Sequence, residues 1–354
     1  MTWYSLPGRR KKCCCFRFLI LIALLAIILL VSGCLNLLRP SVSAKPGEIE
    51  QWVEYLASDE MQGRANGSEQ MKEAADWIAR RFDQFGLRPA PGQESYLQEY
   101  SLSRWDGNSV TERNVVGYVE GVVPELKNEY IIVSAHFDHL GANKLVNVDS
   151  IYNGADDNAS GVATVLGIAR ALKRMRAKPG RSIVFIAYSG EEIGIQGSRY
   201  YSQHPLFALE STWLNINFEM VGQCRNLGKM RYYITGPSYS NIDEIVGQYN
   251  SAGQWQIAGS AKNAERLFLA SDNKSLAVVK REKGISYGVP AHTFSFYDGE
   301  DHLHRPHDEA QFLDYENLAS FVNYMAGLVL RLAELQEDVV WTDEYYRRIG
   351  EEPQ

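Results

Sequence analysis

The strongest constraint on the fold is an unbroken apolar run, Ile183–Tyr188, which is rich in β-branched and aromatic residues. This pattern predicts a strand that is buried on both faces of a parallel or mixed sheet. The run stops at Ser189 and Gly190, and Glu191 and Glu192 follow directly. Ligand sites of open α/β sheets lie at this carboxyl end of the strands. Two adjacent carboxylates there can divide the work, one holding a metal and the other moving a proton, although an isolated Glu-Glu pair is more often a solvated acidic turn.

Length and composition describe an ordinary globular chain. Its 354 residues are 45% hydrophobic and 22% charged, which is enough for one large α/β domain or two smaller ones. The net charge is -7, and the first 33 residues hold bases but no acid, so the remainder is more acidic than the whole chain. An acidic body argues against nucleic acid as a partner.

The N-terminal segment 1–38 has the pattern of a targeting sequence. Basic residues precede the apolar run Phe18–Val31, whose length suits the core of a signal peptide. The run continues into Leu30-Val-Ser-Gly-Cys34, which resembles the bacterial lipobox, so that Cys34 would carry the lipid. The alternative is an uncleaved signal-anchor helix over 18–38. Under either interpretation the chain is held at the cell membrane and its body, from Arg39 onward, lies on the extracytoplasmic side.

We divide the rest of the chain into a tether at 39–47, one catalytic domain at 48–340 and a C-terminal tail at 341–354. Three further cysteines, Cys13 to Cys15, precede the apolar run, which leaves Cys224 alone in the body. An intradomain disulfide is therefore not expected.

Within the domain, the apolar periodicity predicts an alternation of helices and strands, and hence an α/β fold with βαβ crossovers. Gly161–Met175 has the spacing of an amphipathic helix with a basic last turn. The remaining expected elements are helices at 48–58, 69–87 and 309–337, short strands within 96–135 ending at 130–134, and strands at 182–188, 212–218, 231–235 and 291–296.

Histidines and carboxylates recur where these strands end. Five of the seven histidines fall in two windows, one with His136 and His139, the other with His302, His304 and His307. Carboxylates stand at other strand ends or in the loops that follow them, at positions 157, 192 and 219. Imidazole nitrogen and carboxylate oxygen suit zinc, and two metals that share a bridging carboxylate need about this many donors. The sequence has no His-Glu-x-x-His, Gly-x-Ser-x-Gly or phosphate-binding Gly-rich motif.

In its order of motifs the chain resembles the co-catalytic zinc exopeptidases, the family that includes secreted bacterial aminopeptidases, glutamate carboxypeptidase II and the glutaminyl cyclases. The likeness extends from about residue 48 to 335. It begins with Leu56-Ala-Ser-Asp-Glu-Met-Gln-Gly-Arg64 and ends with His304-Arg-Pro-His-Asp308. The resemblance implies a three-layer αβα fold around a mostly parallel mixed sheet, two zinc ions per chain, and peptide substrates for a membrane-anchored bacterial member.

The resemblance also implies roles for individual residues. Asp157, rather than Asp156, would bridge the two metals, and Glu191 would be the general base. The other implied metal ligands are His136, Glu192, Glu219 and His304, with Asp138 and Asp308 as carboxylates that orient the ligands.

Two positions depart from the family pattern. Glu219 stands where many members have Asp, and Leu303 stands where a Tyr often helps to hold the oxyanion, so another donor is needed. His302 and His307 are candidates for that donor, although a solvated histidine at the rim is the favoured interpretation of each. The function expected is aminopeptidase activity. Carboxypeptidase or dipeptidase activity, a single-zinc glutaminyl cyclase and a non-catalytic binding ectodomain remain as alternatives.

Overall fold

The computed structural model describes residue 1 and residues 43–104, 106–143, 149–249, 255–259, 264–279 and 288–349. Residues 1–42 and 43–354 form two separate units. Apart from Met1, the predicted signal peptide or anchor at 1–38, with its four cysteines, lies outside the described residues. Within the described residues, none of the helices has both the length and the apolar character needed to span a bilayer.

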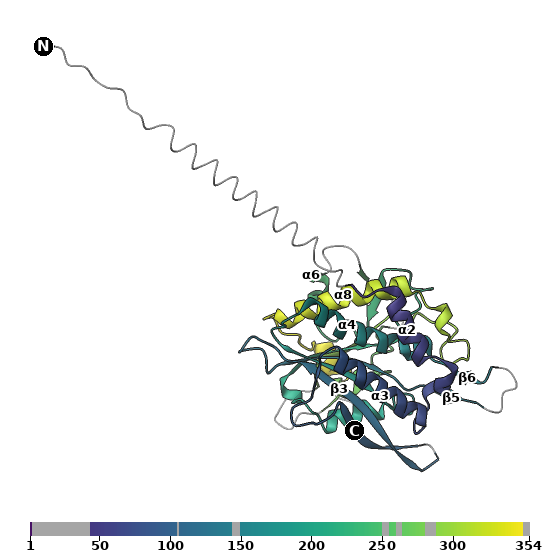
Figure 1. Cartoon of the computed structure of the whole chain (residues 1–354). Coiled ribbons are helices and arrows are strands. Elements are labelled where there is room, and N and C mark those ends of the chain that lie inside the picture. Colours follow the sequence, from purple (N-terminus) through teal and green to yellow (C-terminus); the bar gives the residue numbers. More distant parts are fainter. Residues whose placement is uncertain are drawn as a thin grey trace. The chain divides into compact units, whose positions relative to one another are not determined.

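A mixed sheet of nine described strands forms the centre of the second unit (Figure 1), in the order β1-β3-β7-β4-β8-β11-β9-β10 with β2 paired to β3. The four central strands are parallel, whereas β3 and β9 pair antiparallel with their inner neighbours. The strand bounds are β1 (Arg88–Pro89), β2 (Leu97–Ser103), β3 (Ser109–Val119), β4 (Tyr130–His136), β7 (Ser182–Tyr188), β8 (Thr212–Phe218), β9 (Arg231–Ile234), β10 (Gln256–Ile257) and β11 (Ala291–Ser295). A separate two-stranded sheet pairs β5 (Gly141–Ala142) with β6 (Ile151–Tyr152). The prediction of a mostly parallel mixed sheet is confirmed.

The core lies on both faces of this sheet because alternate residues of its buried strands point in opposite directions. Val133 and Phe185 belong to an apolar cluster with α2 (Pro46–Leu56), α3 (Glu69–Gln84), α4 (Gly161–Met175) and α8 (Tyr315–Glu334). Ile132 and Val184 belong to a second cluster on the opposite face, which includes residues of α5 (Gln196–Gln203), α7 (Asn273–Ala277) and α9 (Asp343–Arg348). The protein therefore has three layers, as predicted.

Most predicted elements have the expected positions, and the differences have local causes. Helix α4 begins and ends where expected. It was expected to be amphipathic, but from Gly161 to Leu172 it is buried on almost all sides, because α2, α3 and α8 also pack against it. Helix α8 begins later than expected because the side chain of Asp314 accepts the amide of Asn317 and caps it there. The short helix α6 (Ile242–Tyr249) contacts α8.

Residues 341–349, which were expected to belong to a tail, pack against the domain instead. The ring of Tyr345 in α9 is fully buried and stacks on Trp341 with 3.9 Å between centroids. Its hydroxyl donates to the carbonyl of Ala277 at 2.5 Å. Aromatic burial of this kind favours an ordered chain over a solvated one.

The register of the central strands fixes where their polar ends meet. His136, the last residue of β4, pairs with Tyr188, the last residue of β7. Strand β8 runs parallel to β4 on its other side and ends just before Glu219. The segments that follow β4, β7 and β8 therefore lie at one edge of the sheet, where the described residues form a pocket.

Candidate metal centre

Asp157 lies at the centre of this edge. It belongs to the turn η2 (Ala155–Ser160) that leads into α4, and its side chain is buried. One carboxylate oxygen, Oδ1, lies 3.3 Å from Nε2 of His136. The other, Oδ2, lies 3.3 Å from Nε2 of His304. The two oxygens of one carboxylate thus face two different imidazoles, which is the arrangement that a bridging ligand needs.

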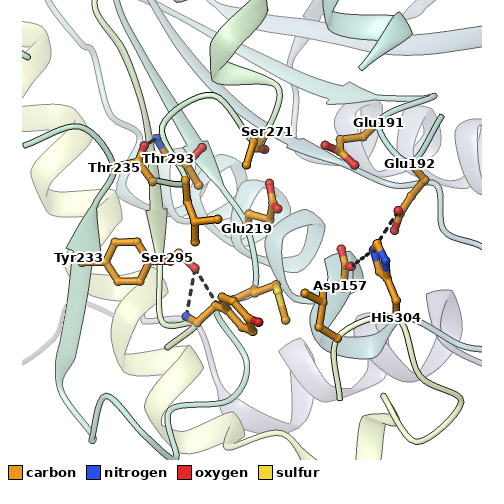
Figure 2. A pocket seen from close by; sticks show the side chains of 15 residues that line it. Asp157, Glu191, Glu192, Glu219, Tyr233, Thr235, Ser271, Thr293, Ser295 and His304 are labelled. Carbon is orange, nitrogen blue, oxygen red and sulfur yellow. Dashed lines mark hydrogen bonds and ion pairs between the residues drawn. The ribbon is translucent and has the colours of Figure 1, made fainter. Parts of the chain in front are cut away.

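Glu192 completes the group on the His304 side. Its Oε2 lies 3.1 Å from Nε2 of His304 (Figure 2), and its side chain is almost wholly buried. His304 itself is half exposed, and its backbone adopts a positive φ of 55°, which is uncommon for a residue other than glycine.

Glu191 and Glu219 line the same cavity of about 300 Å³ as Asp157, Glu192 and His304. Within the described part of the chain, Glu219 makes no ion pair with His136 or His304, and its carboxylate contacts Ser271 instead. Of the six residues expected to form the centre, the structure brings four into direct contact and leaves Glu191 and Glu219 on the cavity wall.

Asp138 does more than orient His136. Its Oδ1 lies 3.6 Å from Nδ1 of His136 and accepts the backbone N–H of Glu191 at 3.1 Å. Its Oδ2 accepts the N–H of Glu192 at 3.2 Å and the side-chain amide of Asn66 at 2.7 Å. One buried carboxylate therefore fixes both the loop after β4 and the Glu-Glu turn after β7.

Asp308 holds the turn that carries Asp157. Its two oxygens accept the backbone N–H groups of Asp156 and Asp157, both at 2.9 Å. Because these donors come from consecutive residues, the carboxylate fixes the direction of the turn. This contact joins two segments that lie about 150 residues apart in the chain.

The prediction that His302 is a solvated rim residue is wrong. Only 2% of its side chain is exposed, and Nε2 lies 2.8 Å from Oδ2 of Asp156. Asp156 also accepts the backbone N–H of Gly222 at 2.7 Å. The Asp156 carboxylate thus ties the 301–308 loop to the η2 turn, which explains the burial of His302. His307 is half exposed, in agreement with its rim interpretation.

Two residues at the centre had no role in the sequence interpretation. His139 is 1% exposed, and its Nδ1 lies 2.7 Å from Oε1 of Glu192. Arg64, the last residue of the family-like segment, is fully buried. Its guanidinium donates to the carbonyls of Phe137 at 2.7 Å and Gly154 at 2.9 Å, and also to those of Leu56 and Asn153.

The position of Arg64 links the loops that carry the histidines and Asp157. Phe137 follows His136 directly, and Gly154 begins the turn that contains Asp157. Burial lowers the pKa of the guanidinium to about 10, although Asp138 and Asp308 oppose this shift. In the sequence, the available signal for Arg64 was its place at the end of the family-like segment 56–64. Only the fold shows which carbonyls the arginine reaches.

Residues 114–329 match the description "Peptidase family M28", which covers more than half of the chain. The chain belongs to peptidase family M28. The predicted resemblance to the co-catalytic zinc exopeptidases is thereby confirmed, and so is the expected fold class.

Relatives of this M28 member differ from it in length. Aminopeptidase YwaD of Bacillus subtilis is 30% identical over 247 residues, which are 66% of this chain and 48% of that protein. A vacuolar membrane protease of Lodderomyces elongisporus is 24% identical over 239 residues, or 66% of this chain and 22% of that protein. The chain thus spans less than half the length of these curated relatives.

Solved structures share the fold of this M28 member at low sequence identity. A glutaminyl cyclase of Porphyromonas gingivalis superimposes with a TM-score of 0.63 at 22% identity, covering 81% of this chain and 98% of that one. A Zn-dependent exopeptidase of Parabacteroides distasonis gives 0.62 at 19% identity, covering 82% and 99%. These values establish the architecture alone.

The donor set fits zinc, the metal that this family membership supports. Within the described residues, Nε2 of His136, Oε1 of Glu192 and Oε2 of Glu219 are buried and have no hydrogen-bond partner. Buried polar atoms rarely remain unpartnered unless an ion or water meets them. Nitrogen and carboxylate oxygen are the donors that zinc takes when no thiolate is present.

The electrostatics of the centre favour a bound cation. Burial raises the pKa of Glu219 to about 8, with the nearby Asp157 adding to the effect. Contacts with Asp157 and Glu192 raise the pKa of His304 to about 10. Such shifts mean that the carboxylates attract positive charge strongly, and a divalent cation satisfies the same demand.

Proposed function

We propose that the protein is a zinc-dependent exopeptidase, specifically an aminopeptidase that removes N-terminal residues from peptides. The observation that carries this proposal is the position of Asp157, whose two oxygens face His136 on one side and His304 on the other. M28 membership and the aminopeptidase among its relatives support the same activity.

The arrangement favours two zinc ions per chain that share Asp157. His136 and Glu219 would hold one ion, and Glu192 and His304 the other. The carboxylate of Glu219 contacts Ser271, while its Oε2 is buried and without a hydrogen-bond partner among the described residues. When bound, zinc supplies Lewis acidity, which polarises a carbonyl and makes water a stronger acid.

Glu191 is the residue that we propose as the general base. Its backbone is fixed by Asp138, while its side chain lines the cavity beside the carboxylates. Burial raises the pKa of Glu191 well above its usual range, and the nearby Glu219 adds to the shift although His136 opposes it. A more basic carboxylate accepts a proton from the attacking water and returns it to the leaving amine.

The walls of the cavity provide the remaining functions. The acidic side chains at its base give a negative surface for the α-ammonium group of a peptide. Leu303 lines the cavity but has no donor, whereas the phenols of Tyr233 and Tyr297 line it as well. Either hydroxyl is a candidate for the oxyanion donor that Leu303 does not provide.

The decisive experiment compares wild type with Glu191→Gln on aminoacyl, carboxy-terminal and dipeptide substrates, with and without chelator. We expect chelator-sensitive aminopeptidase activity in the wild type, and a loss of about 100- to 10,000-fold in the variant. Zinc content should stay near two per chain in both. Glu210→Gln is the matched control, because Glu210 is exposed at the opposite end of β8.

Loss of zinc together with activity in Glu191→Gln would instead make Glu191 a ligand. Cleavage confined to the carboxy-terminal or dipeptide substrates would contradict the aminopeptidase assignment.

One observation favours a single-zinc glutaminyl cyclase as the second candidate. Among the described residues Glu219 forms no ion pair with His136, whereas His304 lies close to both Asp157 and Glu192. A glutaminyl cyclase also shares the fold. One zinc per chain, with cyclisation of an N-terminal glutamine peptide and no hydrolysis of other peptides, would select this function.

We also propose that the N-terminal segment holds the domain at a membrane, on its extracytoplasmic side. The basic and apolar pattern of residues 9–31 supports this, and one relative is named a membrane protease. Labelled fatty acid should enter the wild-type chain and not Cys34→Ser. Retention of the unlabelled wild-type chain in the membrane would support an uncleaved signal anchor. Its full release into solution would exclude both the lipid anchor and the signal anchor.

A further inference from the structure

His139 is a buried residue at the centre, 1% exposed, that has no assigned role. It follows β4, and its backbone N–H donates to the carbonyl of Arg64 at 3.2 Å. Its ring lies against Gly154, where an added Cβ would come within 2.6 Å of ring carbons. The turn thus leaves room for the imidazole only because position 154 is glycine. Such close support fixes the ring in one orientation.

Both ring nitrogens of His139 lack a hydrogen-bond partner among the described residues. Nδ1 lies only 2.7 Å from Oε1 of Glu192, yet the contact does not have the direction of a hydrogen bond. Nδ1 also lies 3.8 Å from Oδ2 of Asp157. A ring nitrogen and a carboxylate oxygen that lie this close without forming a hydrogen bond are typical of two ligands of a common metal.

We propose that Nδ1 of His139 is a further ligand of the metal held by Asp157, Glu192 and His304, an inference that rests on the metal centre proposed above. Zinc lies about 2.0–2.2 Å from its nitrogen and oxygen ligands, so two ligands of one ion lie at most about 4.3 Å apart. The contacts that His139 makes with Asp157 and Glu192 meet this limit. Donor atoms of these three residues lie within 4.8 Å of one another.

A fourth ligand from His139 would make the two metal sites unequal. The ion on the His304 side would have four protein ligands, two imidazoles and two carboxylates, whereas a catalytic zinc commonly has three. The ion on the His136 side would have three. The His139 side should therefore keep its metal when the other side loses it, and chelation should proceed in two steps.

The test uses the whole chain loaded with Co²⁺, whose absorption spectrum reports the number and kind of its ligands. His139→Asn retains a group that can donate a hydrogen bond but is a poor ligand. We expect the affinity of the tighter site to fall by more than about 100-fold, beyond the range for a residue that only supports a ligand. The visible bands of the cobalt at that site should also change.

A second variant gives a positive signal. In His139→Cys a thiolate should bind the cobalt and add a sulfur-to-metal charge-transfer band in the near ultraviolet, beyond any absorption that the wild type and the control variant show there. The matched control is His204→Asn, because His204 is exposed and lies at the end of α5, away from the cavity. Circular dichroism in saturating zinc establishes that each variant is folded.

The outcomes separate the inference from the proposed function. If His139→Asn lowers the affinity by about 100-fold or less with an unchanged spectrum, His139 only supports Glu192 and the inference is wrong. Absence of the charge-transfer band in a folded, cobalt-loaded His139→Cys would also overturn it. If the wild type binds metal as described yet cleaves no peptide, the proposed function fails while the assignment of His139 stands.

Discussion

His139 and His292 are equally buried, but their surroundings are opposite. His292 lies in β11, where Nδ1 donates to the carbonyl of Thr235 at 2.7 Å. Its Nε2 accepts from the hydroxyl of Ser240 at 2.8 Å, because the carbonyl partner requires the proton on Nδ1. His139 has carboxylates as neighbours, and neither of its nitrogens is partnered within the described residues.

This difference separates a structural histidine from a functional one. Burial among neutral groups lowers the pKa of His292 to about 4, so that it stays neutral near pH 7. In the cavity, contacts with Asp157 and Glu192 raise the pKa of His304 to about 10. The first environment excludes positive charge and the second one attracts it. The partners of the ring, and not its burial, decide which role a histidine has.

Removal of zinc should produce the largest contrast between the two regions. Zinc at about a thousand times its dissociation constant stabilises the fold by about 4 kcal/mol, which chelation removes. Hydrogen exchange measured by mass spectrometry should accelerate more in residues 136–139 and 154–160 than in 291–295. Equal acceleration in all three segments would mean that the cavity and the His292 region unfold together.

Arg64→Lys should have the next largest effect, because lysine cannot reach all four carbonyls that the guanidinium contacts. Unsatisfied buried carbonyls should lower the free energy of unfolding by about 3 kcal/mol, measured by urea titration in chelator. The control is Arg88→Lys, whose exposed ion pair with Glu120 should contribute little. A loss confined to zinc affinity, with unchanged apoprotein stability, would contradict this account.

His292→Gln should cost less, about 2 kcal/mol, since it disturbs two neutral hydrogen bonds. Zinc content and the cobalt spectrum should match those of the wild type, which would distinguish this histidine from His139. A variant of His292 that loses metal would remove the distinction between the two regions.

The pH dependence of stability should show the smallest effect. The folded-state pKa of His292, about 4, is below the unfolded value, so the unfolded chain takes up the proton first. This contribution is complete above about pH 6.5 and is lost as the pH falls toward 4. Between pH 7 and 5.5 the wild type should lose about 1 kcal/mol more than His292→Gln. Parallel pH profiles for the two proteins would show that His292 does not titrate as described.

Local patterns predicted most of the framework. The bounds of β7, β8 and α4 follow from apolar runs and periodicity, which depend on neighbouring residues in the chain. The segments that follow parallel strands meet at one edge of the sheet, so a carboxylate and histidine site was expected there. The order of motifs then indicated the family.

Long-range contacts account for what the sequence interpretation missed. His302 is buried because Asp156, 146 positions away in the chain, accepts a hydrogen bond from its ring. Arg64 reaches carbonyls up to 90 positions distant. Residues 341–349 join the domain because Tyr345 reaches Ala277. No local pattern encodes these pairings, since side chains so far apart meet only after the sheet has formed.

The sequence by itself determined the alternation of helices and strands and the edge of the sheet at which polar groups gather, because these depend on periodicity and strand direction. Its order of motifs indicated the family and, through that resemblance, the three-layer fold. Tertiary structure alone decided which of the nearby histidines face a carboxylate and which face a neutral partner. The physical reason is that the charge state and ligand capacity of an imidazole are set within a few ångströms of its two nitrogens, by atoms that the chain brings together from distant segments.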